Sequence, residues 1–122
     1  NLMAEAGTLC GNTDVEKKSG AFGNATADAE AYTNVYIKEA EGEICAACRY
    51  DVVTNYSSLS TIAKEFFRNI ASSYAAVMVI QYDMTGLKTE EAMSLVNINW
   101  AIYREGIKKL EDDKYRDFLG VD

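Results

Sequence analysis

The residues of this chain that are able to do chemistry are carboxylates, cysteines and aromatic side chains, and there is no histidine. Histidine is the usual general base near neutral pH and the commonest metal ligand, so its absence argues against an enzyme. Glu39 and Glu43 are four residues apart and share a helix face, with Glu41 close by. A solvated acidic face is the commoner role of such a group. We therefore predict no catalytic residues and no cofactor.

Cys45 and Cys48 form the one motif that a pattern search would select. Structural zinc takes four Cys or His ligands, and only Cys10 remains to join them. A redox pair gains reactivity at a helix N-terminus, whereas these two lie near the C-terminal end of a predicted helix. We expect both side chains to pack in the core, without a metal or a disulfide.

The elements that position these residues are all expected to be helical. The chain has 122 residues and no proline, the commonest helix breaker. Apolar residues recur at helical spacing over 27–49, with Val35 on the apolar stripe, over 61–83, with Ile62 on the stripe, and over 89–110. A short amphipathic turn follows over 114–119. Ser60 is a candidate N-cap and Gly86 a candidate helix stop.

Two segments show no such pattern. Residues 1–25 hold four of the eight glycines, and a segment without a packed face does not recover its backbone entropy. We expect an extended Gly-rich arm there, with at most one turn near 14–18, before a helical domain over 26–122. Residues 50–59 are expected to form an irregular link, with a short strand over 51–56 as the alternative. The predicted fold is all-α: a small bundle of three main helices, a short C-terminal helix and an extended N-terminal arm.

The second long helix is apolar on all sides over 75–80, and three helices do not offer enough partners to cover it. We therefore expect self-association. Large apolar and aromatic side chains are typical of buried interfaces, and the candidate interface residues are Phe66, Phe67, Tyr74, Met78 and Trp100.

The C-terminal turn carries a second candidate interface. Tyr115, Phe118 and Leu119 lie on a turn too short to be stable alone, so we expect them to dock on a neighbouring protein. Packing back onto the chain's own bundle is the alternative.

The net charge is −7, from 12 basic and 19 acidic residues. An acidic protein is poorly suited to grip nucleic acid or an anionic membrane surface. The longest apolar stretch, 74–80, is far shorter than the ~20 residues of a membrane span. The start of the chain lacks the pattern of a signal peptide. We expect a protein that is made in the cytoplasm.

Three segments of the chain, 29–56, 61–98 and 110–119, resemble the head-to-tail connector (adaptor) proteins of tailed bacteriophages. The most specific parts are the run AEGEICAACRYD over 40–51 and the turn IQYDMTG over 80–86. The resemblance implies an all-α, ring-forming structural virion protein. Such a ring, usually of twelve copies, sits below the portal in the neck of the virion and joins the head to the tail. Its partners would be further copies of itself, the portal protein and tail or neck proteins, with no membrane.

The resemblance also implies roles for charged and apolar residues. The C-terminal docking residues would meet the portal or a neighbouring subunit, and DNA would pass through the ring without specific binding. Acidic side chains that line the channel would repel the phosphate backbone. Two clusters are candidates for this lining: Glu39, Glu41 and Glu43, or Glu111, Asp112 and Asp113.

Two functions of other classes remain open at this point. One is a cytoplasmic helical chaperone or regulator that binds a partner helix in a groove. The other is a small ligand-binding bundle that uses Trp100 and the tyrosines. A groove binder would be monomeric or dimeric, and a ligand-binding bundle would retain a small molecule on purification.

Overall fold

The computed structural model describes residues 7–19, 27–82 and 89–121. Its elements in chain order are α1 (Asn12–Ser19), α2 (Ala27–Cys48), the 3-10 turn η2 (Tyr56–Ser58), α3 (Thr61–Tyr82), α4 (Thr89–Leu110) and α5 (Asp113–Leu119). The described part of the chain contains no strand, so the all-α class is confirmed and the strand considered over 51–56 is wrong. The three long helices lie where the apolar periodicity predicted them.

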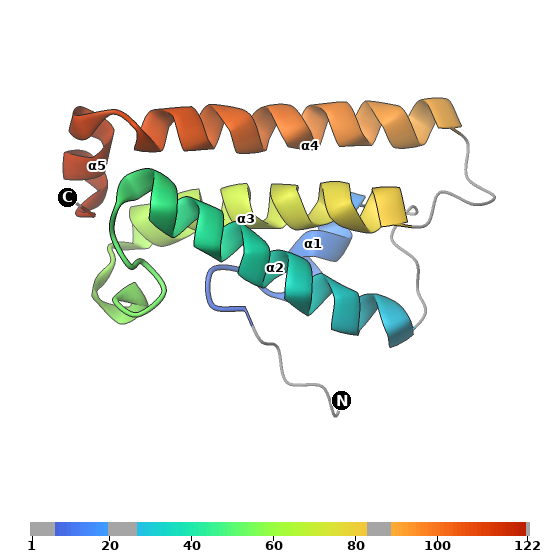
Figure 1. Cartoon of the computed structure of the whole chain (residues 1–122), viewed down its shortest axis with the longest axis horizontal. Helices are drawn as coiled ribbons and strands as arrows, with labels where there is room; N and C mark the ends of the chain where they lie inside the picture. Colours follow the sequence, from blue (N-terminus) through green and yellow to red (C-terminus); the bar gives the residue numbers. More distant parts are fainter. Residues whose placement is uncertain (1–6, 20–26, 83–88, 122) are drawn as a thin grey trace.

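The central element of the bundle is α3, which contacts α1, α2 and α4. Figure 1 shows α4 running alongside α3 in the opposite direction, while α2 crosses α3 at an angle. The short α5 closes one end of the bundle, next to the C-terminal end of α4. Three helices of the same chain, α1, α2 and α4, thus pack against α3.

Residues 7–19 differ from the extended arm expected from the sequence. They include α1, whose residue Val15 is buried, and the preceding Leu9 and Cys10 also join the core. The amides of Asp14 and Val15 donate to the Gly11 carbonyl and start the helix. A helix of eight residues is not stable alone, so its docking on α3 must hold it. The boundary expected near residue 25 lies outside the described residues.

The predicted burial of residues 75–80 on every side is confirmed for most of the segment. Ala75, Ala76 and Ile80 have no exposed surface, and Val77 and Val79 are also buried. The cover, however, comes from the same chain, because α1 adds a fourth helix to the three that were expected. Burial of residues 75–80 within the chain therefore removes the support that this segment gave to self-association.

Local features set the start of α3 and its spacing from α4. The Ser60 hydroxyl accepts a hydrogen bond from the Ala63 amide at 3.1 Å, which confirms the predicted N-cap. Gly106 of α4 faces Ile70 of α3, and a Cβ at position 106 would lie 2.5 Å from Ile70 Cγ1. Glycine therefore permits the close approach of the two helices. The stop predicted at Gly86 lies outside the described residues.

Candidate functional site

Three aromatic rings from α3 and α4 gather next to α2. The ring centroid of Tyr74 is 5.1 Å from that of Tyr103 and 6.4 Å from that of Trp100, and Trp100 stacks on Tyr103 at 5.3 Å. Tyr103 is buried, whereas Tyr74 and Trp100 are half-buried and present ring surface to solvent. Each such ring pair adds about 0.5–1.5 kcal/mol beyond the burial of area, so the rings hold one another in place.

Two exposed carboxylates of α2 border these rings. The Tyr74 hydroxyl donates to Glu39 Oε1 at 3.3 Å. Burial, and after it the negative charge of Glu43, raises the pKa of Tyr103 to about 12. Burial and the neighbouring Glu39 raise the pKa of Tyr74 as well. Among the described residues neither carboxylate forms an ion pair. We call this site the acidic aromatic surface: Tyr74, Trp100, Tyr103, Glu39 and Glu43.

A groove with a volume of about 180 Å³ continues this surface between α3 and α4. It shares Trp100 with the aromatic rings, and its walls are mainly apolar. Two side-chain amides, from Gln81 and Asn97, stand among them. The other lining residues are Val77, Met78 and Val96. The groove therefore offers an apolar slot that leads to an aromatic face.

The sequence placed these residues in two separate sets. Tyr74, Met78 and Trp100 were candidates for a subunit interface, and Glu39 and Glu43 were candidates for a channel lining. The structure brings both sets together on one side of the bundle. Sequence reasoning did not select Tyr103 for this site, although its i, i+3 spacing from Trp100 would have placed both rings on one face of α4.

Glu41 does not belong to this surface. Its side chain is 6% exposed, and Oε2 accepts hydrogen bonds from the amides of Leu9, at 2.8 Å, and Thr8. Residues two apart on a helix do not share a face, which turns Glu41 away from Glu39 and Glu43. Its predicted channel role is therefore wrong, and its carboxylate instead anchors residues 8–9 to α2.

Two neighbouring phenylalanines of α3 have different surroundings. Phe67 has no exposed surface and lies in the core, so its predicted place at a subunit interface is wrong. Phe66 packs edge-on against Phe67, with ring centroids 5.5 Å apart, and remains half-buried. Phe66 also lines a second groove, of about 370 Å³, between α3 and α4 near Gly106.

The predicted docking residues of α5 divide into two groups. Leu119 is 5% exposed and packs in the core, as the alternative expectation had it. Tyr115 and Phe118, three residues apart on the same helix, are 46% and 70% exposed. The helix thus uses one side for its own bundle and turns two large apolar side chains outward.

The orientation of α5 is fixed by bonds within the chain. The Asp112 carboxylate accepts from the Lys114 amide at 2.8 Å as N-cap, and Gly120 ends the helix in the left-handed region. The buried Arg116 guanidinium donates to the Leu110 carbonyl at 2.7 Å and pairs with Asp113. Of the second acidic cluster, Asp112 and Asp113 therefore stabilise the corner, and all three members, including Glu111, are exposed.

The cysteine motif lies at the corner where α2 ends. Cys48 is buried, and its thiol contacts the carbonyls of Cys45 and Tyr50; burial raises the pKa of this thiol. Arg49 takes a left-handed conformation, with φ of 57°, and reverses the chain. Asp51 then accepts from both the amide and the hydroxyl of Thr54, which lowers the pKa of Asp51. The run over 45–51 thus builds a helix stop followed by a turn.

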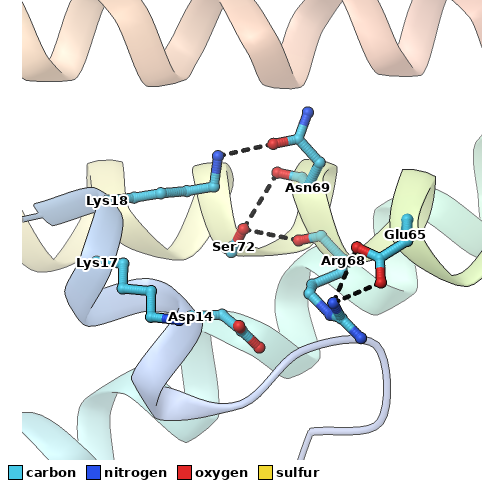
Figure 2. A pocket seen from close by; sticks show the side chains of 7 residues that line it. All are labelled: Asp14, Lys17, Lys18, Glu65, Arg68, Asn69 and Ser72. Atoms are coloured by element: carbon cyan, nitrogen blue, oxygen red, sulfur yellow. Dashed lines mark hydrogen bonds and ion pairs between the residues drawn. The ribbon is translucent and has the colours of Figure 1, made fainter.

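A polar cleft of about 180 Å³ lies between α1 and α3 and is lined by residues of both helices. Figure 2 shows Lys18 reaching from α1 to Asn69 of α3, where its ammonium donates to the amide oxygen at 2.7 Å. Arg68 pairs with Glu65 on the same helix. Burial lowers the pKa of Lys18, and the charge of Asp14 opposes that shift. The polar groups of this cleft therefore join α1 to α3.

Cys10, Cys45 and Cys48 form no disulfide in the described part of the chain. Within residues 7–19, 27–82 and 89–121 no three His, Cys, Asp or Glu side chains cluster as metal ligands would. None of the described helices is long and apolar enough to span a bilayer. Comparison with known protein families, characterised proteins and solved structures finds no match to the chain.

Proposed function

We propose that this chain is a structural virion protein, a subunit of the oligomeric head-to-tail connector ring that joins the portal to the tail. The ring would lie in the neck of the virion and leave a channel for DNA. The proposal starts from the sequence resemblance over 29–56, 61–98 and 110–119. One structural observation carries it furthest: Tyr115 and Phe118 stand outward on a helix whose orientation the chain itself fixes. A prepositioned apolar pair of this kind suits docking on another protein.

The resembling segments also include both corners of the bundle. The run over 45–51 stops α2, and the run over 110–119 turns the chain from α4 into α5. In the second run the residue types meet needs of the backbone: an N-cap at Asp112 and a guanidinium at Arg116 that bonds to the Leu110 carbonyl. Similarity at these positions supports a shared fold and says nothing about shared chemistry.

Ring contacts would use the apolar side chains that the bundle leaves exposed. Val35 on α2, Ile62 on α3 and Ile98 on α4 are 52%, 62% and 58% exposed. They lie on three different helices, and a closed ring needs two different faces of the subunit in contact. These residues replace the segment over 75–80 as the support for self-association.

The channel would be lined by exposed carboxylates without an ion pair in the described part of the chain, namely Glu39 and Glu43, or Glu111 and the helix-capping Asp112. A ring of subunits that each carry −7 repels the phosphate backbone and lets DNA pass. Substitution of the lining residues by Lys is expected to slow DNA ejection. The effect should fade at high salt, because the Debye length falls to ~3 Å at 1 M.

The direct test mixes the purified chain with the portal protein encoded in the same genome. Native mass spectrometry and electron microscopy then count the copies bound. A ring of many copies on the portal supports the proposal, and Phe118→Ser should prevent its attachment. A strict one-to-one complex, or no complex, contradicts it. A stable complex of one chain with a single helix of another protein would favour the chaperone function instead.

A further inference from the structure

We propose that the acidic aromatic surface binds an arginine side chain presented by a basic segment of another protein. The inference concerns one side of the single chain and does not depend on ring assembly. It assigns a partner chemistry to a surface that the bundle leaves uncovered.

The acidic aromatic surface pairs aromatic faces with carboxylates. A guanidinium is planar and stacks on tryptophan and tyrosine rings, and its N–H groups form a fork that matches carboxylate oxygens. Tyr74 and Trp100 present half-exposed rings, and Glu39 is held against Tyr74 by the hydroxyl bond. Glu43 lies one helical turn further along α2 on the same face. The two groups that recognise a guanidinium thus lie side by side.

The groove that shares Trp100 suits the apolar part of an arginine side chain. An arginine carries its charge on an apolar stem of three methylene groups, which packs on apolar walls while the head remains polar. The walls formed by Val77, Met78 and Val96 suit such a stem. The amides of Gln81 and Asn97 in the same groove can bond to the backbone of the segment that carries the arginine.

Charge favours a different protein over a second copy of this chain as the partner. The chain carries −7, so two copies repel each other at long range. Of its four arginines, Arg68 is paired with Glu65 and Arg116 is buried, which leaves Arg49 and Arg104 exposed. Arg104 follows Trp100 by one helical turn, yet in the described part of the chain it forms no ion pair with either carboxylate. Both carboxylates therefore remain available to pair with a basic partner.

Trp100 supplies the assay, because it is the single tryptophan of the chain. The probe is a blocked tetra-arginine peptide, titrated at low salt while the emission of Trp100 is recorded. The emission of Trp100 is expected to change and to reach a plateau as the peptide concentration rises. Tetra-lysine should bind more weakly, since an ammonium does not stack on a ring as a guanidinium does. Tetra-citrulline, which is planar but uncharged, should not bind.

The decisive variant is the double change Glu39→Gln and Glu43→Gln, which keeps an oxygen to accept from Tyr74. It is expected to weaken tetra-arginine binding about tenfold. The matched control, Glu16→Gln with Glu105→Gln, removes the same charge from exposed positions on α1 and on α4. The control should bind almost as tightly as the unchanged chain.

Three results would overturn the inference: no saturable change, equal binding of tetra-lysine and tetra-arginine, or equal weakening in the two double variants. The last would show that only net charge attracts the peptide. Failure of this assay leaves the proposed connector function intact, because the portal experiment does not use the peptide. Likewise, failure of the chain to assemble on the portal protein would not affect the result of the peptide titration.

Discussion

Two adjacent residues of α5 allow docking to be separated from folding. Phe118 is 70% exposed, and exposed residues of this kind change the free energy of unfolding by less than about 0.5 kcal/mol when replaced. Leu119 is 5% exposed and packs in the core. Replacement of a buried leucine by alanine costs about 2–5 kcal/mol. The structure therefore predicts opposite behaviour for Phe118→Ser and Leu119→Ala.

The assay measures both properties on the same samples. Urea denaturation followed by circular dichroism gives the free energy of unfolding, and native mass spectrometry with the portal protein gives attachment. Phe118→Ser should unfold like the unchanged chain and yet lose attachment by at least about 2 kcal/mol, roughly 30-fold, as loss of an aromatic anchor does. Leu119→Ala should unfold at lower urea, while its folded fraction still attaches.

Met93→Ser is the matched control, because Met93 is an exposed apolar residue, 41% exposed, on α4. It should leave both measurements unchanged. Normal attachment of Phe118→Ser would refute the docking role of α5. A loss of more than about 1 kcal/mol in its free energy of unfolding would refute the outward position of the ring, since a large cost requires burial.

Three further predictions test the packing and the electrostatics of the bundle. Glu41→Ala leaves two amide donors unpaired and is expected to lower the free energy of unfolding by about 2–4 kcal/mol, whereas Glu41→Gln should lower it by about 1 kcal/mol. Faster hydrogen exchange of the amides at residues 8 and 9 would report the loss of these two bonds. Gly106→Ala should cost about 1–3 kcal/mol by overpacking Ile70, and the cost should vanish in an Ile70→Ala background, which a double-mutant cycle measures. Tyr103 titrates near pH 10 when unfolded and at about 12 when folded, so between these values the folded state holds a proton that the unfolded state has lost. The stabilisation from neutral Tyr103 is thus complete below about pH 10 and is lost as the pH rises to about 12. Over this range the free energy of unfolding should fall by up to about 1.4 kcal/mol per pH unit. Tyr103→Phe should reduce this fall, which urea denaturation at successive pH values measures.

The long helices were predictable because each combines a broad apolar face with a local start or stop. Ser60 illustrates this, since its type and position predicted the N-cap that the structure shows. The short α1 was not predictable in the same way. Its eight residues include one large apolar side chain, Val15, which gives no periodicity. Its stability comes from contacts far away in sequence, such as the bond from Lys18 to Asn69.

The choice of buried face was less accurate than the choice of helix. Val35 and Ile62 were placed on apolar stripes, but both are more than half exposed. Ala40 of the predicted α2 stripe is buried as expected, but the core face of α3 includes the small residue Ala63, which has no exposed surface and lies outside the predicted stripe. Small side chains face inward where helices approach closely, and a search for large apolar residues shifts the stripe away from them.

The meeting of Glu39 and Glu43 with the aromatic rings changes what their charge can do. The sequence fixes their common face on α2, but their neighbours depend on how α2 packs against α3 and α4, which periodicity does not report. A carboxylate that pairs with a partner's arginine is neutralised and cannot also repel DNA in an open channel. The two proposed roles are therefore exclusive for these residues. If the peptide binds, the exposed carboxylates of the second cluster, Glu111, Asp112 and Asp113, remain for the channel. Glu111→Lys should then slow ejection, while Glu39→Lys should instead weaken binding of the basic partner.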